Sequence, residues 1–365
     1  MTSRIHNTLA SERADRGWTQ AQVAQLGGIS RQSYSAIEAG AAVPSTEIAL
    51  RLARAFGRGV EELFQLPEAP APTVVAVAAR EAGRIGQRVR LARVGGRTVA
   101  YALGEAERPM RPADGVVRGV REGGEVEVSL LGDRPPEAAL VVVGCDPAFG
   151  LVAEGMRRER GVEVAWSQRG SRAALEAVGR GEAHVAGAHL RDAESGEHNA
   201  RWVRELIPFS CTRVTFADWE QGILLGAGNP LGVSGVEDLA RPRLRFLNRE
   251  RGSGSRALLD ERLRLAGVPE GRVAGYATGA RGHMAVAEAI ASGAADAGVG
   301  IRAAGQAFGL HVVPLETERY ELVIPDHFLD LPGVQALLET LGRPAVRAQV
   351  EALGGYDGSA MGRPA

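Results

Sequence analysis

Two proline-rich stretches divide this chain into three parts whose hydrophobic patterns differ. The first, Pro67-Glu68-Ala69-Pro70-Ala71-Pro72, predicts an extended, semi-rigid linker over residues 67–73, and Pro135-Pro136 marks a second boundary. A chain of 365 residues is too long for one ordinary compact domain. We therefore expect a multidomain protein with an all-α domain over 1–66, a small α+β middle segment over 74–137 and a two-lobed α/β domain over 138–360.

The first part has the pattern of short helices. Apolar residues at helical spacing, with Ser or Thr caps before them and glycines after them, predict helices over 5–15, 20–26, 31–39 and 46–56 and a last turn over 59–66. The glycine-containing turn at Gly27-Gly28 lies between two of these helices. Two short helices around such a turn indicate a helix-turn-helix.

Several motifs of this part occur together in a known family. Residues 19–24 (TQAQVA), 28–33 (GISRQS), 37–40 (IEAG) and 44–45 (PS) resemble the Cro/phage-repressor (XRE) class of DNA-binding domains over about residues 5–66. The resemblance implies that the second motif helix enters the major groove of double-stranded operator DNA. Because residues 1–66 carry nearly balanced charge, we expect DNA binding to depend on a homodimer that presents two half-sites. Arg31 is suited to guanine, Gln32 to adenine, and Gln20 to a phosphate. The predicted DNA contacts are Gln20, Ser30, Arg31, Gln32, Ser33 and Ser35.

Three further residues of this part have predicted structural roles. We expect Tyr34 and Ile37 in the core of the domain, and Glu38 as a hydrogen-bond or ion-pair partner inside it.

The middle segment has mixed patterns. An apolar run predicts a helix over 74–85, and alternation predicts strands over 88–91, 97–101, 116–120 and 125–131, with a hairpin turn at Gly95-Gly96. The segment carries no recognisable chemistry, so we expect a spacer or a dimerisation element.

The third part alternates strands with helices. Strands are predicted over 140–144, 162–166, 183–188, 244–247 and 297–300, and helices from about 147 and over 171–179, 255–266 and 283–292. This order is typical of open α/β domains with parallel sheets, which bind ligands beyond the carboxyl ends of their strands. Four strand-to-helix turns, over 144–147, 167–172, 248–256 and 278–283, are rich in glycine and small polar residues. Such turns expose N–H groups to anions, so the pattern predicts two lobes that close on one small anion.

Side chains in and near these turns are the candidate ligand contacts. Arg172 and Arg256 are suited to an oxyanion. Alternatives remain open: the serines are also typical helix N-caps, His189 and Asp192 also fit a turn-stabilising pair, and His283 a structural helix start. The predicted set is Cys145, Asp146, Gly170, Ser171, Arg172, His189, Asp192, Arg251, Ser253, Gly254, Ser255, Arg256, Thr278 and His283.

The third part also carries a family resemblance. Residues 144–148 (GCDPA), 186–190 (AGAHL), 221–222 with 228–230, 248–249 with 254–256, 294–301 and 318–325 resemble the periplasmic-binding-protein-like (type II) domain related to molybdate-binding proteins, over about 138–345. The resemblance implies lobe I over 138–215 and 325–360, lobe II over 218–320, and molybdate or tungstate as the ligand.

These features together predict a cytoplasmic, ligand-responsive transcription regulator. The polar N-terminus and the lack of a long apolar run indicate no secretion and no membrane partner. Because the sequence has no lysine, no Walker motif, no nucleophile–base pair and no clustered metal ligands, we expect neither an enzyme nor a cofactor or metal site. Two alternatives remain: the same architecture sensing an amino acid, a pterin or another organic anion, and an enzyme or accessory protein of molybdenum-cofactor metabolism.

Overall fold

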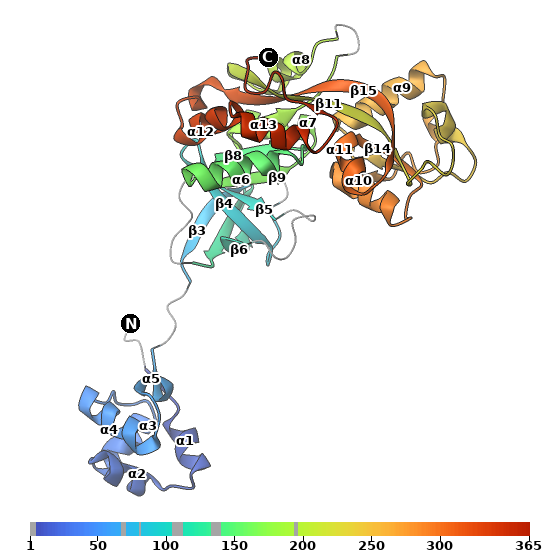
Figure 1. Cartoon of the computed structure of the whole chain (residues 1–365). Helices are drawn as coiled ribbons and strands as arrows, with labels where there is room; N and C mark the ends of the chain where they lie inside the picture. The colour runs from blue at the N-terminus through green and yellow to red at the C-terminus, as the bar shows by residue number, and fades with distance from the viewer. Residues whose placement is uncertain (1–4, 67–70, 80–81, 104–111, 133–139, 193–195) are drawn as a thin grey trace. The chain divides into compact units, whose positions relative to one another are not determined.

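The chain forms two compact units in the computed structural model, residues 1–70 and 71–365 (Figure 1). The structure describes residues 5–66, 71–79, 82–103, 112–132, 140–192 and 196–365. Most of the predicted linker, residues 67–70, lies outside the described residues, and Thr73 already belongs to a strand.

The N-terminal unit is a helical domain, as predicted. Its helices are α1 (Leu9–Asp15), α2 (Gln20–Gly27), α3 (Arg31–Glu38), α4 (Thr46–Phe56) and α5 (Val60–Leu63), and the short strands β1 (His6–Asn7) and β2 (Phe64–Gln65) pair its two ends. The hydroxyls of Thr19, Ser30 and Ser45 cap the starts of α2, α3 and α4 by accepting backbone N–H groups. Tyr34 and Ile37 lie in its core, which confirms the prediction for both residues.

The middle segment is a closed five-stranded barrel. Its strands are β3 (Thr73–Ala78), β4 (Arg88–Val94), β5 (Arg97–Ala102), β6 (Gly115–Val120) and β7 (Glu125–Leu130). The prediction of a helix over 74–85, and with it the α+β assignment, was wrong: the described part of this segment contains strands and no helix. β3 pairs with β7 on one side and with β5 on the other. These non-local pairings and its β-branched valines favour a strand over a helix for this segment.

The barrel does not stand apart as a spacer. Val94, Val99 and Tyr101 lie in the same hydrophobic core as the α/β domain behind it. The Tyr101 hydroxyl donates to the carbonyl of Glu182, and Arg97 donates to the carbonyls of Arg180 and Gly181. The barrel and the first α/β lobe therefore form one packed body.

The α/β domain is built on a nine-stranded sheet in two lobes. Lobe I contains β8 (Leu140–Gly144), α6 (Phe149–Arg160), β9 (Val164–Gln168), α7 (Ser171–Gly179), β10 (Val185–Ala188), α8 (Ala200–Leu206), η4 (Asp326–Phe328), α12 (Pro332–Leu341), α13 (Pro344–Glu351) and β16 (Tyr356–Asp357). Lobe II contains η2 (Val236–Ala240), β12 (Phe246–Arg249), α9 (Gly254–Leu265), η3 (Glu270–Arg272), β13 (Gly279–Ala280), α10 (Gly282–Ala291), β14 (Ala297–Ile301) and α11 (Arg302–Ala307).

Two long strands, β11 (Cys211–Leu225) and β15 (His311–Pro325), run side by side from one lobe to the other (Figure 1). They pair antiparallel with each other, so the sheet is mixed. The prediction of parallel sheets holds only for the pairs β8–β9 and β8–β10 of lobe I and β12–β13 and β12–β14 of lobe II. In lobe I, β15 pairs with β10; in lobe II, β11 pairs with β14. The lobes are thus connected through one continuous pair of strands.

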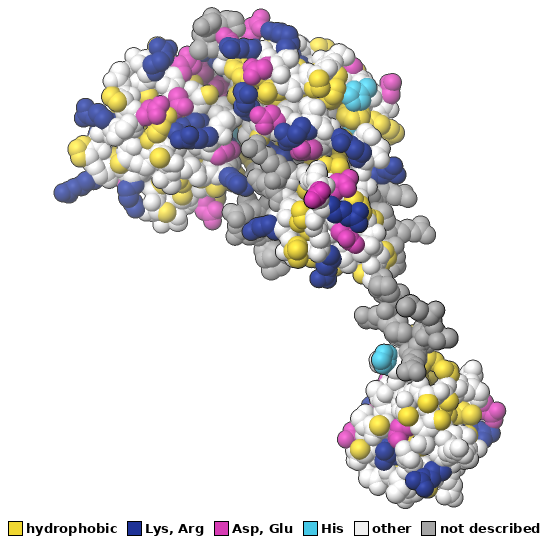
Figure 2. Space-filling model, turned by 180° about the vertical axis from the view of Figure 1, so that it is seen from behind, with side chains coloured by type: hydrophobic (Ala, Val, Ile, Leu, Met, Phe, Trp, Pro, Cys, Tyr) yellow, Lys and Arg dark blue, Asp and Glu magenta, His cyan; other side chains and the backbone are white. Residues whose placement is uncertain are grey.

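The surface of the larger unit carries charges of both signs. On the face shown in Figure 2, arginine side chains and acidic side chains are interspersed, consistent with the formal net charge of −1. Among the described residues, none of the helices is long and apolar enough to span a bilayer.

Candidate functional site

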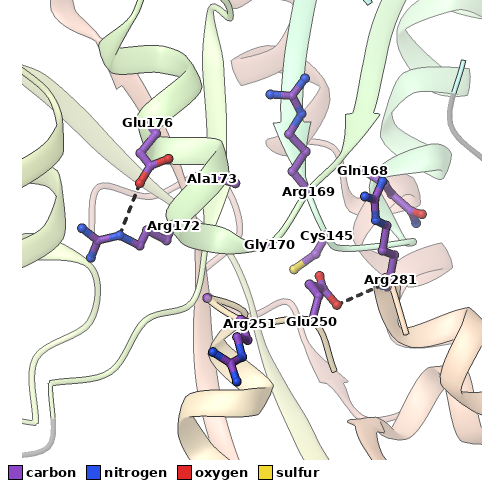
Figure 3. A pocket seen from close by; sticks show the side chains of 12 residues that line it. Cys145, Gln168, Arg169, Gly170, Arg172, Ala173, Glu176, Glu250, Arg251 and Arg281 are labelled. Carbon is purple, nitrogen blue, oxygen red and sulfur yellow. Dashed lines mark hydrogen bonds and ion pairs between the residues drawn. The ribbon is translucent and has the colours of Figure 1, made fainter. Parts of the chain in front are cut away.

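A cavity of about 360 Å³ lies where strand ends of both lobes meet. Cys145 follows β8, Gln168 ends β9, Glu250 follows β12 and Arg281 follows β13, so the cavity lies at the carboxyl ends of strands, as predicted. Figure 3 shows side chains from both lobes converging around Cys145 and Glu250. The lining consists of Cys145, Gln168, Arg169, Gly170, Arg172, Ala173, Glu176, Glu250, Arg251, Gly252, Arg281 and Gly282.

Three helices begin at this place. α7 starts after Gly170, α9 after Ser253 and α10 after Arg281. The first N–H groups of a helix lack partners within the helix, and its dipole places partial positive charge there. The converging helix starts therefore favour an anion in the cavity.

Four arginines, from both lobes, line the cavity. Arg172 pairs with Glu176 at 3.3 Å, while Arg251 and Arg281 are exposed. The Arg169 guanidinium points away from Cys145 (Figure 3) and lies 3.6 Å from Glu182. The lining thus combines three arginines at the surface with Arg169, whose buried side chain reaches toward Glu182.

Glu250 holds the lobe II side of the cavity together. Its carboxylate accepts two hydrogen bonds from Arg249, at 2.9 and 3.0 Å, and a third from the N–H of Gly282 at 3.4 Å. Burial favours the neutral acid, but Arg249 outweighs it and lowers the pKa of Glu250. This anionic side chain therefore fixes the end of β12 to the start of α10.

Glycines allow the two lobes to touch beside the cavity. A Cβ on Gly170 of lobe I would lie 3.3 Å from the Cα of Ser253 in lobe II. A Cβ on Gly254 of lobe II would lie 2.4 Å from Cε1 of His189 in lobe I. Any side chain at Gly254 would therefore push the lobes apart.

Cys145, which lines the cavity, forms a buried cluster with His189 and His283. Their sulfur and one ring nitrogen of each histidine lie within 4.8 Å of one another, a grouping that could hold a metal ion. The sequence showed no clustered metal ligands because these three residues come from three separate elements, which only the fold brings together. Nδ1 of His189 lies 2.8 Å from Glu318. Burial lowers the pKa of this imidazole, but Cys145 and Glu318 outweigh burial and raise the pKa to about 10.

The predicted ligand contacts fall into three groups. Four of them line the cavity, namely Cys145, Gly170, Arg172 and Arg251. Six are fully or almost fully buried just behind the lining, namely Ser171, His189, Ser253, Gly254, Ser255 and His283. The remaining four, Asp146, Asp192, Arg256 and Thr278, do not line the cavity.

The structure gives these four residues other contacts. Asp146 accepts from the hydroxyl of Tyr356 at 2.6 Å, and Asp192 accepts from Arg201 at 2.9 Å. The Arg256 guanidinium lies 4.0 Å from the centre of the Tyr276 ring.

Thr278 is exposed, and its carbonyl accepts from the N–H of Asn248 at 3.0 Å.

Several lining residues were not predicted. Gln168, Arg169 and Arg281 lie within the very turns that the glycine pattern identified, and an arginine beside those glycines was an available signal. Glu176 comes from the body of α7 and has no such signal.

The predicted DNA contacts lie at the start of α3. Arg31, Gln32 and Ser33 are exposed in its first turn and Ser35 is half-buried. Ser30 caps the helix, and its hydroxyl accepts from the N–H of Ser33 at 3.0 Å.

The predicted phosphate ligand Gln20 has a partner inside the domain. Its amide donates to Glu38 at 2.6 Å, and Arg13 donates to the same carboxylate at 2.7 Å. These bonds confirm the expected role of Glu38 as a partner inside the domain. To bind a phosphate, Gln20 would have to break its hydrogen bond with Glu38.

Comparison with protein families agrees with this architecture. A family model described as a PBP superfamily domain matches residues 152–342, more than half of the chain. The chain belongs to the PBP superfamily. A second model, described as helix-turn-helix, matches residues 9–63, so an N-terminal helix-turn-helix domain precedes the PBP-like domain.

Relatives match separate parts of the chain. The uncharacterized protein YvgK of Bacillus subtilis is 34% identical over 198 residues, which are 53% of this chain and 63% of that protein, so the chain spans less than two thirds of it. The uncharacterized HTH-type transcriptional regulator YgzD of Bacillus subtilis is 37% identical over 64 residues, which are 18% of this chain and 97% of that protein.

Solved structures with this fold are distant. The tungstate ABC transporter structure from Geobacter sulfurreducens is 18% identical, with 59% of this chain and 98% of that chain covered and a TM-score of 0.46. A putative phosphate ABC transporter substrate-binding protein with bound phosphate, from Clostridium perfringens, is 12% identical, with 60% and 98% covered and a TM-score of 0.44.

Proposed function

We propose that this protein is a transcription regulator whose helix-turn-helix binds operator DNA under the control of a small oxyanion, molybdate or tungstate, bound by the PBP-like domain. The observation that carries the proposal is the cavity between the lobes, where four arginines and three helix starts surround one space.

Local charge favours an anion in this cavity. Its lining contains four arginines and two glutamates, and both glutamates are paired with arginines. Positive and negative side chains are interspersed on the face shown in Figure 2, so we attribute the attraction to the arginines of the cavity, which act at short range.

The size of the cavity supports a second candidate ligand class. A volume of about 360 Å³ exceeds what a single tetrahedral anion fills, and falls within the range of roughly 300–1,000 Å³ usual for organic ligands. An organic anion such as a pterin or an amino acid would fill it, whereas an oxyanion would require further closure of the lobes or bridging waters.

The DNA-binding role rests on the first turn of α3. Arg31 and Gln32 are exposed there, where this kind of helix presents side chains to base edges. The DNA-binding unit has nearly balanced charge, so we propose that a homodimer presenting two half-sites supplies the affinity.

Thermal unfolding of the full chain with molybdate, tungstate, sulfate, phosphate and a set of organic anions tests the ligand. A ligand that binds the folded protein raises stability by about 2.7 kcal/mol at 100 times its Kd. We expect stabilisation by molybdate and tungstate, weakened in Arg251→Ala and unchanged in Arg264→Ala, which removes an exposed arginine of the same lobe outside the lining.

Stabilisation by organic anions alone would replace the oxyanion by the second candidate, and no response to any anion would refute the sensing role. Operator affinity must also differ between saturating ligand and no ligand, because only differential binding shifts the equilibrium.

A further inference from the structure

The buried cluster of Cys145, His189 and His283 draws on both lobes. Cys145 and His189 follow β8 and β10 of lobe I, whereas His283 is the second residue of α10 in lobe II. All three side chains are buried, and Cys145 is the member that lines the cavity. Anything bound at this cluster would therefore connect the lobes.

Both imidazoles have one nitrogen without a nitrogen or oxygen partner among the described residues. These atoms are Nε2 of His189 and Nε2 of His283, and both are buried. A buried polar group without a partner costs about 1–3 kcal/mol. Two such groups in one cluster indicate a missing ligand atom.

The contacts of His283 fix which nitrogen carries its hydrogen. Arg249 donates from Nη1 to Nδ1 of His283 at 2.8 Å, and the N–H of Ile301 donates to the same nitrogen at 3.3 Å. Arginine and the backbone N–H have only hydrogens to offer, so Nδ1 must supply the lone pair. Burial and Arg249 lower the pKa of His283 well below its usual value, so the ring is neutral and Nε2 carries the hydrogen.

His189 also presents a hydrogen. The carboxylate of Glu318 lies 2.8 Å from its Nδ1 and accepts the hydrogen there. Because Nδ1 of His189 faces Glu318, the hydrogen bond between His189 and the Cys145 side chain falls on Nε2, so Nε2 also carries a hydrogen, and the pKa of His189 is raised against the opposing effect of burial.

These hydrogen positions argue against a metal ion. A metal ion needs a lone pair on each histidine nitrogen that binds it. The lone pair of His283 faces Arg249 instead, and the buried Arg249 charge next to the cluster repels a cation.

We propose that the buried cluster is an anion site, in which Nε2–H of His189 and Nε2–H of His283 donate to one deprotonated oxygen of the ligand and so hold the two lobes together. This inference rests on the proposed function and deepens it, because it names the atoms that recognise the oxyanion. Cys145 forms the wall past which that oxygen enters from the cavity.

Titration of the full-length protein and its variants tests this proposal, with tungstate, sulfate and phosphate as anions and Zn²⁺ as the metal. His189→Leu and His283→Leu should each weaken the tightest of these anions at least about tenfold, since each removes a hydrogen bond to a charged ligand. His189→Gln keeps an N–H donor at a similar distance from the backbone, so it should weaken anion affinity less than His189→Leu does. Arg264→Ala, which lies outside the cavity lining, should keep anion affinity within about threefold, and Zn²⁺ should bind no more tightly to the wild type than to Cys145→Ser.

Three results would overturn the proposal. Unchanged affinity in the histidine variants, with loss in Arg251→Ala, would leave the oxyanion sensor intact and place the anion outside the cluster. Tight Zn²⁺ binding that Cys145→Ser abolishes would make the cluster a metal site. Binding of no anion to the wild type would remove both the oxyanion ligand and this site. Should a leucine variant fail to fold, the His189→Gln and Cys145→Ser comparison still separates an anion from a metal.

Discussion

Replacing Gly254 by alanine should keep the two lobes from closing. The added Cβ would lie 2.4 Å from Cε1, 2.6 Å from Nδ1 and 2.9 Å from the carbonyl oxygen of His189. All three distances are shorter than carbon atoms tolerate, and the last involves backbone. His189 is fully buried and bonded to Glu318, so it has little freedom to move away.

The cost of this substitution follows from the geometry. Forcing an extra methyl group into a closed contact costs about 1–3 kcal/mol. If the lobes separate to avoid the clash, the same free energy is lost from ligand binding, which corresponds to about a 5- to 150-fold weaker Kd. The folding of each lobe should be unaffected, because alanine at the first position of α9 is compatible with a helix.

The assay is calorimetric titration of the anion that stabilises the wild type. Gly150→Ala is the matched control: Gly150 lies in α6, where an added Cβ meets nothing within 4 Å, so the variant should bind normally and gain about 0.5–1 kcal/mol of stability. Wild-type affinity in Gly254→Ala would show that ligand binding does not need the lobes to meet at this point.

Three further variants test other parts of the structure. Burial raises the pKa of Asp146 from 3.8 to about 6, so the folded state binds the proton more tightly, and the free energy of unfolding should fall by up to about 3 kcal/mol as pH rises from 4 to 6. Asp146→Asn keeps the acceptor for Tyr356 and should flatten this pH dependence in urea titrations; an unchanged slope would contradict the assignment. Tyr101→Phe leaves the buried carbonyl of Glu182 without its donor and should cost about 1–3 kcal/mol in urea unfolding, whereas a change below about 0.3 kcal/mol would mean that the bond is not made. Arg31→Ala should weaken specific operator binding by about 1–3 kcal/mol in fluorescence anisotropy without changing thermal stability, and equal loss on unrelated DNA would argue against base recognition.

The sequence predicted those elements whose signals are local. α2, α3 and α4 begin where Thr19, Ser30 and Ser45 predicted, because an N-cap and its helix are neighbours in the chain. The valine-rich run from Val74 was misassigned because its partners, β5 and β7, lie far along the sequence.

The long strands were missed for a related reason. Polar residues interrupt the hydrophobic pattern of β11. They form ion pairs with residues far along the chain: Asp218 pairs with Arg319 on β15, and Glu220 pairs with Arg302 at the start of α11. A single sequence does not reveal those pairings.

The candidate site, like the fold, could be predicted from the sequence only in part. Glycine-rich turns identified the edge of the sheet at which the cavity lies, because that edge follows from strand order. Which side chains face one another across the lobes depends on the whole fold. Glu318 contacts His189 because β15, which carries it, runs from one lobe to the other. No local sequence pattern indicates this contact.

The shared core of the barrel and lobe I has a mechanical consequence. Tyr101 and Arg97 attach the barrel to residues 180–182 of lobe I, and the helix-turn-helix unit is joined in sequence to the barrel ahead of Thr73. If the two lobes rotate relative to each other, the barrel therefore moves together with lobe I. The connection to the helix-turn-helix unit ends on that same body, so it would not by itself transmit a displacement of lobe II.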